Sequence, residues 1–163
     1  MSDISNQSDK SNWSDKIPLT GSRFLTDGAP GGMGLEFYLG EDGVVVATVT
    51  PELRHEGPPG HVHGGFATAL LDEAMGAAVW QAGHRAVTVN LVTDFRAPVP
   101  IGAEVTVRGW VDRIEGKKIH SVGSITLPDG RLAVEGRGLW VEMPEMFKNA
   151  TENDRPFGFP RAR

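Results

Sequence analysis

The sequence predicts an α+β domain in which an antiparallel sheet wraps around one long helix. Residues 66–80 are apolar except for Thr68, Asp72 and Glu73, and they are rich in Ala, Leu and Met, which favour helix. A helix that is apolar on nearly every side is surrounded by other structure. Short β-like segments flank this run, and the later ones alternate apolar and polar residues with period two. A sheet with one helix on its face is an α+β arrangement, and this helix is covered fully only if the sheet curls around it or a second subunit helps.

Two strands are predicted before the helix. Residues 1–16 are rich in Ser, Asp and Asn, which is typical of a flexible tail. Residues 17–34 contain two prolines and five glycines and are predicted to be loop. Residues 35–39 and 44–50 are the predicted strands, joined by a hairpin turn at residues 40–43.

The helix itself follows a loop of unusual composition. Residues 57–65 (GPPGHVHGG) contain two prolines and four glycines, which do not fit the interior of a helix or a central strand. We expect a helix of about 17 residues from Gly65, or ~25 Å at 1.5 Å per residue. Gly83 is placed to end it as a C-cap residue.

Four further strands are predicted after the helix, at residues 87–95, 105–111, 118–127 and 131–143. In the first of them, Val87, Val89, Leu91 and Phe95 alternate with Thr88, Asn90 and Asp94. In the last, Gly136 and Gly138 suggest a bulge or a close neighbour.

Length and composition bound the type of protein. The chain has 163 residues and no strong internal break, so we expect one domain over residues 17–143, an N-terminal tail at 1–16 and a C-terminal tail at 144–163. A net charge of −5 without a basic run argues against a nucleic-acid partner. The absence of cysteine excludes a disulfide framework and a thiolate nucleophile. With no run of 18 apolar residues and a polar N-terminus, the expected location is the cytoplasm, with neither a membrane span nor a secretory signal.

The predicted helix carries two features that suit acyl transfer. At about 100° per residue, Asp72 shares a stripe with Thr68 and with small residues, whereas Glu73 points away from that stripe. Gly64 and Gly65 offer backbone N–H groups at the positive end of the helix dipole. Such donors can hold a developing oxyanion, and a carboxylate further along the helix can activate water.

This pattern resembles the hot-dog-fold acyl-CoA thioesterases, and within them the PaaI-like group and its Them-type members most closely. The resemblance covers residues 35–143, and the residues that carry it are Gly57-Pro58-Pro59-Gly60, His63-Gly64-Gly65, Ala67-Thr68, Asp72, Gly76, Thr88-Val89-Asn90-Leu91 and Phe95-Arg96-Ala97-Pro98-Val99-Pro100.

The resemblance implies a role for several residues. The backbone N–H of Gly64, or of its neighbour Gly65, would hold the thioester carbonyl oxygen, and Asp72 would activate water or attack the thioester directly. Thr88 would position the water or the carboxylate from across a dimer interface, and His63 would support the site. Many PaaI-like enzymes carry an Asn or Gln a few residues before the His-Gly-Gly segment, where this chain has Arg54-His55-Glu56-Gly57, so the polarising residue would be His63, His55 or absent. The substrate would be an acyl-CoA with no separate cofactor, and the protein would be a homodimer or a dimer of dimers.

Other candidates have plainer explanations. Glu73 is expected to form an interface or helix-end ion pair, and His55, His61, His84 and His120 are expected to be structural or exposed. His61 and His63 could begin a metal site, but no third ligand lies at a usual spacing, so no metal is expected.

Strand alternation sends the Thr88 side chain either to solvent or to a neighbouring subunit, and Asn90 shares its face as a substitute candidate. Arg96 is a candidate partner for a coenzyme A phosphate, together with Arg108, Arg113, Lys117 and Lys118, although solvated charge is the usual role of each.

Two other functions remain open alongside the thioesterase. A hot-dog hydratase or dehydratase would add water to an enoyl-CoA or remove it, and a non-catalytic protein would bind acyl-CoA as a sensor. The sequence does not specify the acyl group.

Overall fold

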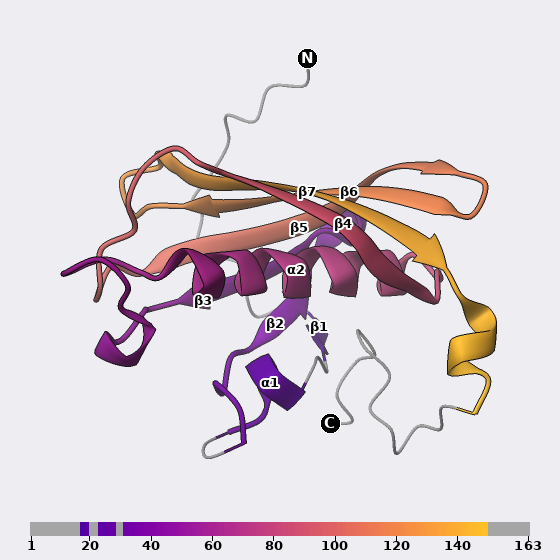
Figure 1. Cartoon of the computed structure of the whole chain (residues 1–163), viewed down its shortest axis with the longest axis horizontal. Helices are drawn as coiled ribbons and strands as arrows, with labels where there is room; N and C mark the ends of the chain where they lie inside the picture. The colour runs from indigo at the N-terminus through magenta and orange to yellow at the C-terminus, as the bar shows by residue number, and fades with distance from the viewer. Residues whose placement is uncertain (1–16, 20–22, 29–30, 150–163) are drawn as a thin grey trace.

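A seven-stranded antiparallel sheet and one long helix make up most of this computed structural model, which describes residues 17–19, 23–28 and 31–149. In Figure 1 the strands β4 (Ala86–Phe95), β5 (Val105–Glu115), β6 (Lys118–Thr126) and β7 (Leu132–Glu142) lie above the helix α2 (Gly64–Gln81). The short strands β1 (Ile17–Leu19) and β2 (Phe37–Leu39) lie below it, and β3 (Val45–Val49) connects the two groups. The sheet therefore passes around α2, and the predicted α+β wrapping is confirmed.

The order of strands in the sheet is β1-β2-β3-β5-β6-β7-β4. Strand β4 thus forms one edge, although it is the first strand after the helix, because it pairs with β7 over residues 86–95. The edge that it leaves open is ten residues long.

A row of glycines lets α2 lie close against the sheet. Gly109, Gly123 and Gly136 are neighbours in register on β5, β6 and β7. A Cβ on Gly109 would lie 2.4 Å from the backbone carbon of Ala74, so any side chain there would push the helix away. Leu71 and Met75 fill the space above the other two glycines. The close neighbour expected for Gly136 is therefore the central helix.

Residues 17–34 differ from the prediction that they are loop. Residues 17–19 form β1, and a short helix, α1 (Arg23–Thr26), follows. Leu19 pairs with Phe37, and both Leu19 and Leu25 are buried. The glycine and proline content predicted a loop, but these segments are ordered because the two leucines are buried and β1 pairs with β2. The hairpin turn after β2 is confirmed, since Gly40 N–H donates to the carbonyl of Val44 and Asp42 and Gly43 have positive φ values of 56° and 73°.

Strand β4 contains a bulge that the period-two pattern did not predict. Thr88 pairs with Trp140 and Asn90 pairs with Leu139, so Val89 is the extra residue between them. Paired residues of an antiparallel sheet share a face, so Thr88 lies on the helix side with the buried Trp140. The regular alternation predicted for this strand is therefore wrong at the bulge, where Val89 is 54% exposed.

The segment after β7 is not simply a tail. Residues Pro144–Phe147 form a 3-10 turn, η4, and the ring of Phe147 packs edge-on against Trp80 at 4.8 Å. The flexible tail predicted at 1–16 and the rest of the C-terminal tail lie outside the described residues. No helix of the described part is both long enough and apolar enough to cross a membrane.

Candidate active site

The first turn of α2 is held in place by its own N-cap residue, His63. The Nδ1 atom of His63 accepts a hydrogen bond of 2.9 Å from the Gly65 N–H, and the His63 carbonyl accepts from the N–H groups of Phe66 and Ala67. In the part of the chain that the structure describes, the Gly64 N–H has no hydrogen-bond partner. Of the two donors considered from the sequence, Gly64 is therefore the one whose N–H is open to a ligand.

The loop before the helix is fixed by close backbone contacts. The His63 N–H donates to the carbonyl of His55 over 2.8 Å. A Cβ on Gly57 would lie 2.7 Å from the Cα of His63, so this position requires glycine. The ring of His55 is buried and stacks on Phe66 at 4.0 Å, and its Nδ1 accepts from the Glu52 N–H. His55 thus anchors the loop, and burial lowers the pKa of its imidazole, with the Arg54 charge adding to the effect.

The carboxylate of Asp72 lies on the side of α2 that faces β4. It is half-buried, and its Oδ1 accepts a hydrogen bond of 3.0 Å from the Thr88 hydroxyl. Burial raises the pKa of Asp72 above its ordinary value, and the hydrogen bond from Thr88 offsets part of that rise. One turn earlier, the Thr68 and Thr93 hydroxyls lie 3.5 Å apart, so this stripe of α2 meets β4 through polar groups.

Two sequence expectations about β4 are corrected by this geometry. Thr88 contacts Asp72 of its own chain, whereas the sequence placed it in solvent or on a neighbouring subunit. Asn90 does not share the face of Thr88, because the bulge at Val89 sends it to the outer face of the sheet. Asn90 is exposed there and lies on the opposite side of the sheet from Asp72.

Gly64 and Asp72 are far apart within one chain. Asp72 follows Gly64 by eight positions on a continuous helix, which corresponds to ~12 Å along the axis at 1.5 Å per residue. An oxyanion donor and a water-activating carboxylate must both lie within hydrogen-bond reach of one reacting centre. These two groups of a single chain therefore cannot act on the same carbonyl.

A cavity of about 430 Å³ opens beside Gly64. It lies between the loop that precedes α2, the first turn of α2 and the chain that follows β4. Its walls are mainly apolar and include Pro58, Val62, Ala67, Phe95, Val99 and Val134. The ring of Phe95 leans over the helix start, with its Cζ 3.2 Å from the position that a Gly64 Cβ would occupy.

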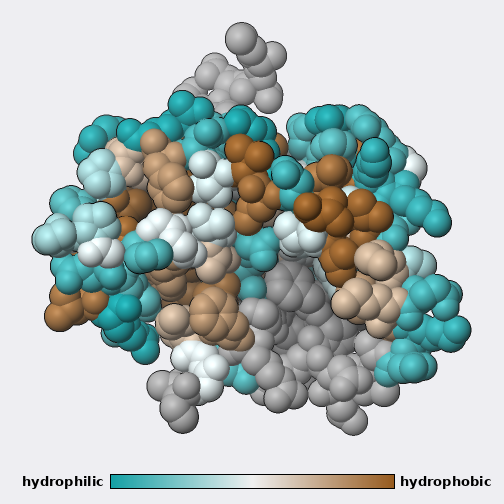
Figure 2. Space-filling view, in the orientation of Figure 1, coloured by the Kyte–Doolittle hydropathy of each residue, from teal (hydrophilic) through white to brown (hydrophobic). Residues whose placement is uncertain are grey.

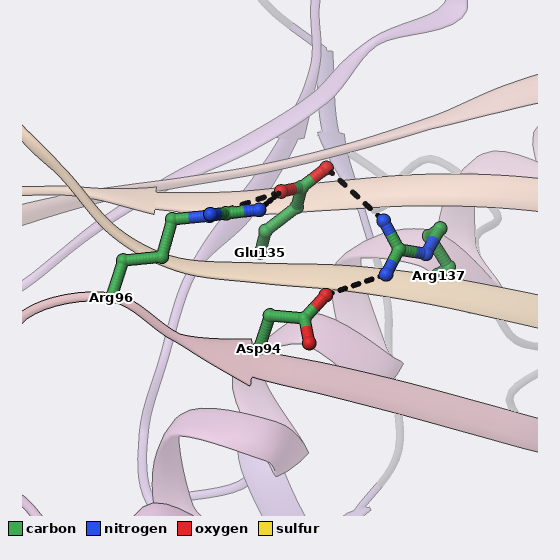
Figure 3. A network of polar contacts seen from close by, with 4 residues as sticks. All are labelled: Asp94, Arg96, Glu135 and Arg137. Atoms are coloured by element: carbon green, nitrogen blue, oxygen red, sulfur yellow. Dashed lines mark hydrogen bonds and ion pairs between the residues drawn. The ribbon is translucent and has the colours of Figure 1, made fainter.

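Arg96 lies at this cavity and belongs to a charged network on the outer face of the sheet (Figure 3). Its Nε and Nη2 donate to one oxygen of Glu135 over 3.2 and 2.7 Å. Arg137 bridges from Glu135 to Asp94, at 3.7 and 2.5 Å. The network joins the end of β4 to β7 and fixes the direction of the Arg96 side chain.

The remaining candidates have structural roles. Glu73 is buried on α2 and lies off the Asp72 stripe. His84 pairs with Glu142 at 2.6 Å, His120 lies 3.5 Å from Glu115, and His61 Nδ1 lies 3.0 Å from the Pro59 carbonyl. Among the described residues, no group of three or more His, Cys, Asp or Glu side chains is arranged to hold a metal ion.

Sequence reasoning missed two residues that shape the site. Glu135, which directs Arg96, was not singled out in the sequence, and Phe95 was named there only as an apolar strand residue and as part of the resemblance. The pairing of β4 with β7 brings both to the site, and no local signal in the sequence reports that pairing.

Comparison with known proteins agrees with this geometry. The model of the thioesterase superfamily matches residues 59–134, which include the helix and the strands that carry the site. The acyl-coenzyme A thioesterase THEM4 of Xenopus laevis is 33% identical over 117 residues, which is 69% of this chain and 52% of the relative. A crystal structure of a thioesterase superfamily protein superposes with a TM-score of 0.66 at 35% identity, covering 68% of this chain and 55% of the other.

The chain belongs to the thioesterase superfamily. Its fold is the hot-dog fold that the sequence predicted, which the PaaI protein of E. coli also has, with a TM-score of 0.63 at 22% identity over 68% of this chain and 84% of that one. The PaaI-like and Them-type resemblance is confirmed. This thioesterase superfamily member spans about half the length of the curated relatives it matches.

Proposed function

We propose that this protein hydrolyses the thioester bond of an acyl-CoA to a free acid and coenzyme A. The observation that carries the proposal is the Asp72–Thr88 pair on a helix whose first N–H, that of Gly64, is open. A half-buried carboxylate with a raised pKa is suited to accept a proton from water, and an open N–H at a helix start is suited to an oxyanion. The curated relatives named acyl-coenzyme A thioesterases support this substrate class.

The proposed reaction follows from these groups. Water loses a proton to Asp72 as its oxygen bonds to the thioester carbon, and the carbonyl oxygen gains negative charge against the Gly64 N–H. The carbon–sulfur bond then breaks, and the sulfur leaves as the thiol of coenzyme A with the proton. Thr88 holds the carboxylate in position, and His63 supports the site by capping the helix start.

We propose further that each site is shared between two copies of the chain. Because Gly64 and Asp72 of one chain are ~12 Å apart along the helix at 1.5 Å per residue, the Gly64 N–H of one protomer would act with Asp72 and Thr88 of the other. The open edge of β4 is the natural place for a second copy, since it is long and carries the exposed residues Val89, Val92 and Phe95. Figure 2 shows hydrophobic residues gathered over the region where β4 and α2 lie in the same view. The expected homodimer, or dimer of dimers, fits this edge.

Substrate binding is proposed at the same end of the helix. The ion pair with Glu135 uses Nε and Nη2 of Arg96, and we propose that its Nη1 donates to a phosphate of coenzyme A. Gly65 contributes by holding the His63 ring through its N–H. The cytoplasmic location expected from the sequence stays a prediction, which fractionation of cells expressing the native protein would test.

The proposal is tested by changing one functional group at a time. Asp72→Asn should lower kcat on acyl-CoA substrates by about 10²- to 10⁴-fold, the range for a general base. Gly64→Pro removes the N–H and adds a small ring, at a helix position that tolerates proline. His63 already has the extended backbone that precedes proline (φ −63°, ψ 131°). This variant should lower kcat by about 10²- to 10³-fold.

Gly64→Ala is the matched control, because it adds a comparable side chain beside Phe95 but keeps the N–H. It should retain most activity. Equal losses in the Pro and Ala variants would remove the Gly64 N–H from the mechanism, and full activity of Asp72→Asn would remove Asp72.

A further inference from the structure

We infer that His55 is a positioning residue of the proposed reaction: it fixes the place of the Gly64 N–H, the donor assigned to the carbonyl oxygen. The inference rests on the proposed thioesterase function and deepens it. It gives His55 a role that needs no contact with the substrate.

His55 holds the chain on both sides of Gly64. Its carbonyl accepts a hydrogen bond of 2.8 Å from the N–H of His63, the residue before Gly64. Its ring stacks on the ring of Phe66, two residues after Gly64, with the ring centroids 4.0 Å apart and the planes 4° from parallel. Both His55 and Phe66 are buried. The peptide that carries the Gly64 N–H therefore lies between two points that one residue fixes.

The imidazole of His55 ties these contacts to the turn before the loop. Its Nδ1 accepts a hydrogen bond of 2.9 Å from the Glu52 N–H, across the 3-10 turn η3 (Leu53–His55). This bond fixes both the plane of the ring and the direction of the His55 carbonyl. Among the common side chains, only a neutral histidine offers a flat ring with an acceptor at the δ position. Burial lowers the pKa of His55, with the Arg54 charge adding to the effect and the Glu52 charge opposing it, and this keeps the ring neutral at neutral pH.

The other ring nitrogen shows that His55 does not act on the substrate itself. A neutral imidazole that accepts a hydrogen bond at Nδ1 carries its proton on Nε2. In the described part of the chain, this Nε2 is buried and has no hydrogen-bond partner. No substrate atom reaches it in this structure, so His55 does not polarise the carbonyl directly.

The unpartnered Nε2–H also argues against a role in stability alone. A buried donor without a partner lowers the stability of the fold, and such a group calls for an explanation. Phenylalanine would stack on Phe66 without that cost. The bond at Nδ1 is what only the histidine supplies, and its effect is to fix the chain around Gly64.

The test separates positioning from folding by changing the ring nitrogens alone. His55→Phe keeps a flat ring beside Phe66 and removes the unpartnered Nε2–H. It also frees the N–H of Glu52, an exposed residue, and this N–H can then bond to water. The free energy of unfolding in urea should therefore be no lower in the variant than in the native protein.

The activity of the same variant should nevertheless fall. Its kcat on acyl-CoA substrates should be about tenfold lower or more, because a misplacement of about 1 Å in a site can cost about 10²-fold. Its KM should stay within about twofold of the native value, because the Gly64 N–H acts mainly on charge that develops in the transition state. His120→Phe is the matched control: it makes the same change at a histidine of β6 that pairs with Glu115, and it should keep the native kcat.

A double-mutant cycle shows whether His55 acts through the Gly64 N–H. That N–H is absent in the Gly64→Pro background, so adding His55→Phe there should change kcat by less than about twofold. His55→Asn keeps an acceptor at the δ position and loses the ring face, and it should show the same coupling to Gly64→Pro.

The assays use acetyl-, octanoyl- and phenylacetyl-CoA. Equal losses of kcat in the native and Gly64→Pro backgrounds would overturn the inference, and so would a native kcat in His55→Phe. A His55→Phe protein that unfolds more easily than the native one would overturn it too, because its loss of activity would follow from its loss of structure. A native protein that hydrolyses none of the three substrates overturns the proposed function itself, so the two failures are distinct.

Discussion

At the scale of single residues, the chemistry of the site is concentrated in the contact between Asp72 and Thr88. The carboxylate is paired with one hydroxyl and is half-buried, so its pKa is set by two opposing effects, burial raising it and the hydrogen bond lowering it. When either effect is removed, the direction in which the pKa of Asp72 moves can be predicted.

Replacing Thr88 by Val should shift the activity profile to higher pH. The hydrogen bond favours the ionised carboxylate, so its loss raises the pKa of Asp72 further. A base acts only when ionised, and activity should therefore be lost at a higher pH on acidification than in the native protein. The measurement is kcat as a function of pH. Thr88→Ser keeps the hydroxyl and should keep the native profile, and a Val variant with an unshifted acidic limb would contradict the role given to this contact.

Replacing Asp72 by Asn should stabilise the fold at neutral pH. The pKa of Asp72 is raised in the folded state, so its contribution to stability is fully present below the unfolded pKa and is lost as the pH rises through the folded pKa. Asn never ionises and avoids that loss. Urea unfolding at neutral pH should give a higher free energy of unfolding for the variant, and the gain should vanish below the ordinary Asp pKa of about 3.9. A variant that is less stable at neutral pH would refute this.

At the scale of elements, the site depends on how closely α2 lies against the sheet. The aligned glycines of β5, β6 and β7 bring the helix backbone onto the sheet, and Leu71 and Met75 fill the remaining space. The bulge at Val89 then turns Thr88 toward the same helix. The distance between Asp72 and Thr88 is a consequence of these two features together.

Gly109→Ala should destabilise the protein by about 1–3 kcal/mol or more, the usual cost of overpacking. Its Cβ would lie 2.4 Å from the backbone of Ala74, which cannot rotate away as a side chain could. The displaced helix should also lose activity through Asp72. Gly28→Ala is the control, since a Cβ there meets nothing within 4 Å, and it should change the free energy of unfolding by no more than about 0.5 kcal/mol. Chemical denaturation of the two variants checks the difference.

At the scale of the whole molecule, the decisive feature is the distance along α2 between the Gly64 N–H and the Asp72 carboxylate. A single chain holds an open N–H at one place and an activated carboxylate ~12 Å further along, eight residues at 1.5 Å each. In a two-fold dimer formed through the β4 edge, the Gly64 N–H of each chain would lie near the Asp72 carboxylate of the other chain. Such a dimer would therefore have two sites.

Mixing two inactive variants should restore activity. In a heterodimer of Gly64→Pro and Asp72→Asn chains, a shared arrangement places both defects in one site and leaves the other site intact. Random pairing of equal amounts should then give about a quarter of the native activity in a two-fold dimer. The variants are co-unfolded and refolded together, and each variant refolded alone is the control. If each site belonged to one chain, every site would carry a defect and the mixture would stay inactive.

The sequence by itself determined the fold class and the extent of the helix to within one residue at its start, and it singled out Asp72 as the candidate carboxylate. These are local properties, because an apolar run, its glycine-rich beginning and the two acidic residues within it can be read from neighbouring residues.

The tertiary structure decided which way Thr88 and Asn90 face, which glycine N–H is open, and what surrounds Phe95 and Arg96. A bulge moves every later side chain of a strand to the other face, and period-two reasoning cannot detect one extra residue. The order β6-β7-β4 likewise joins residues about forty positions apart, such as Arg96 and Glu135, and such pairings depend on the packing of the whole sheet.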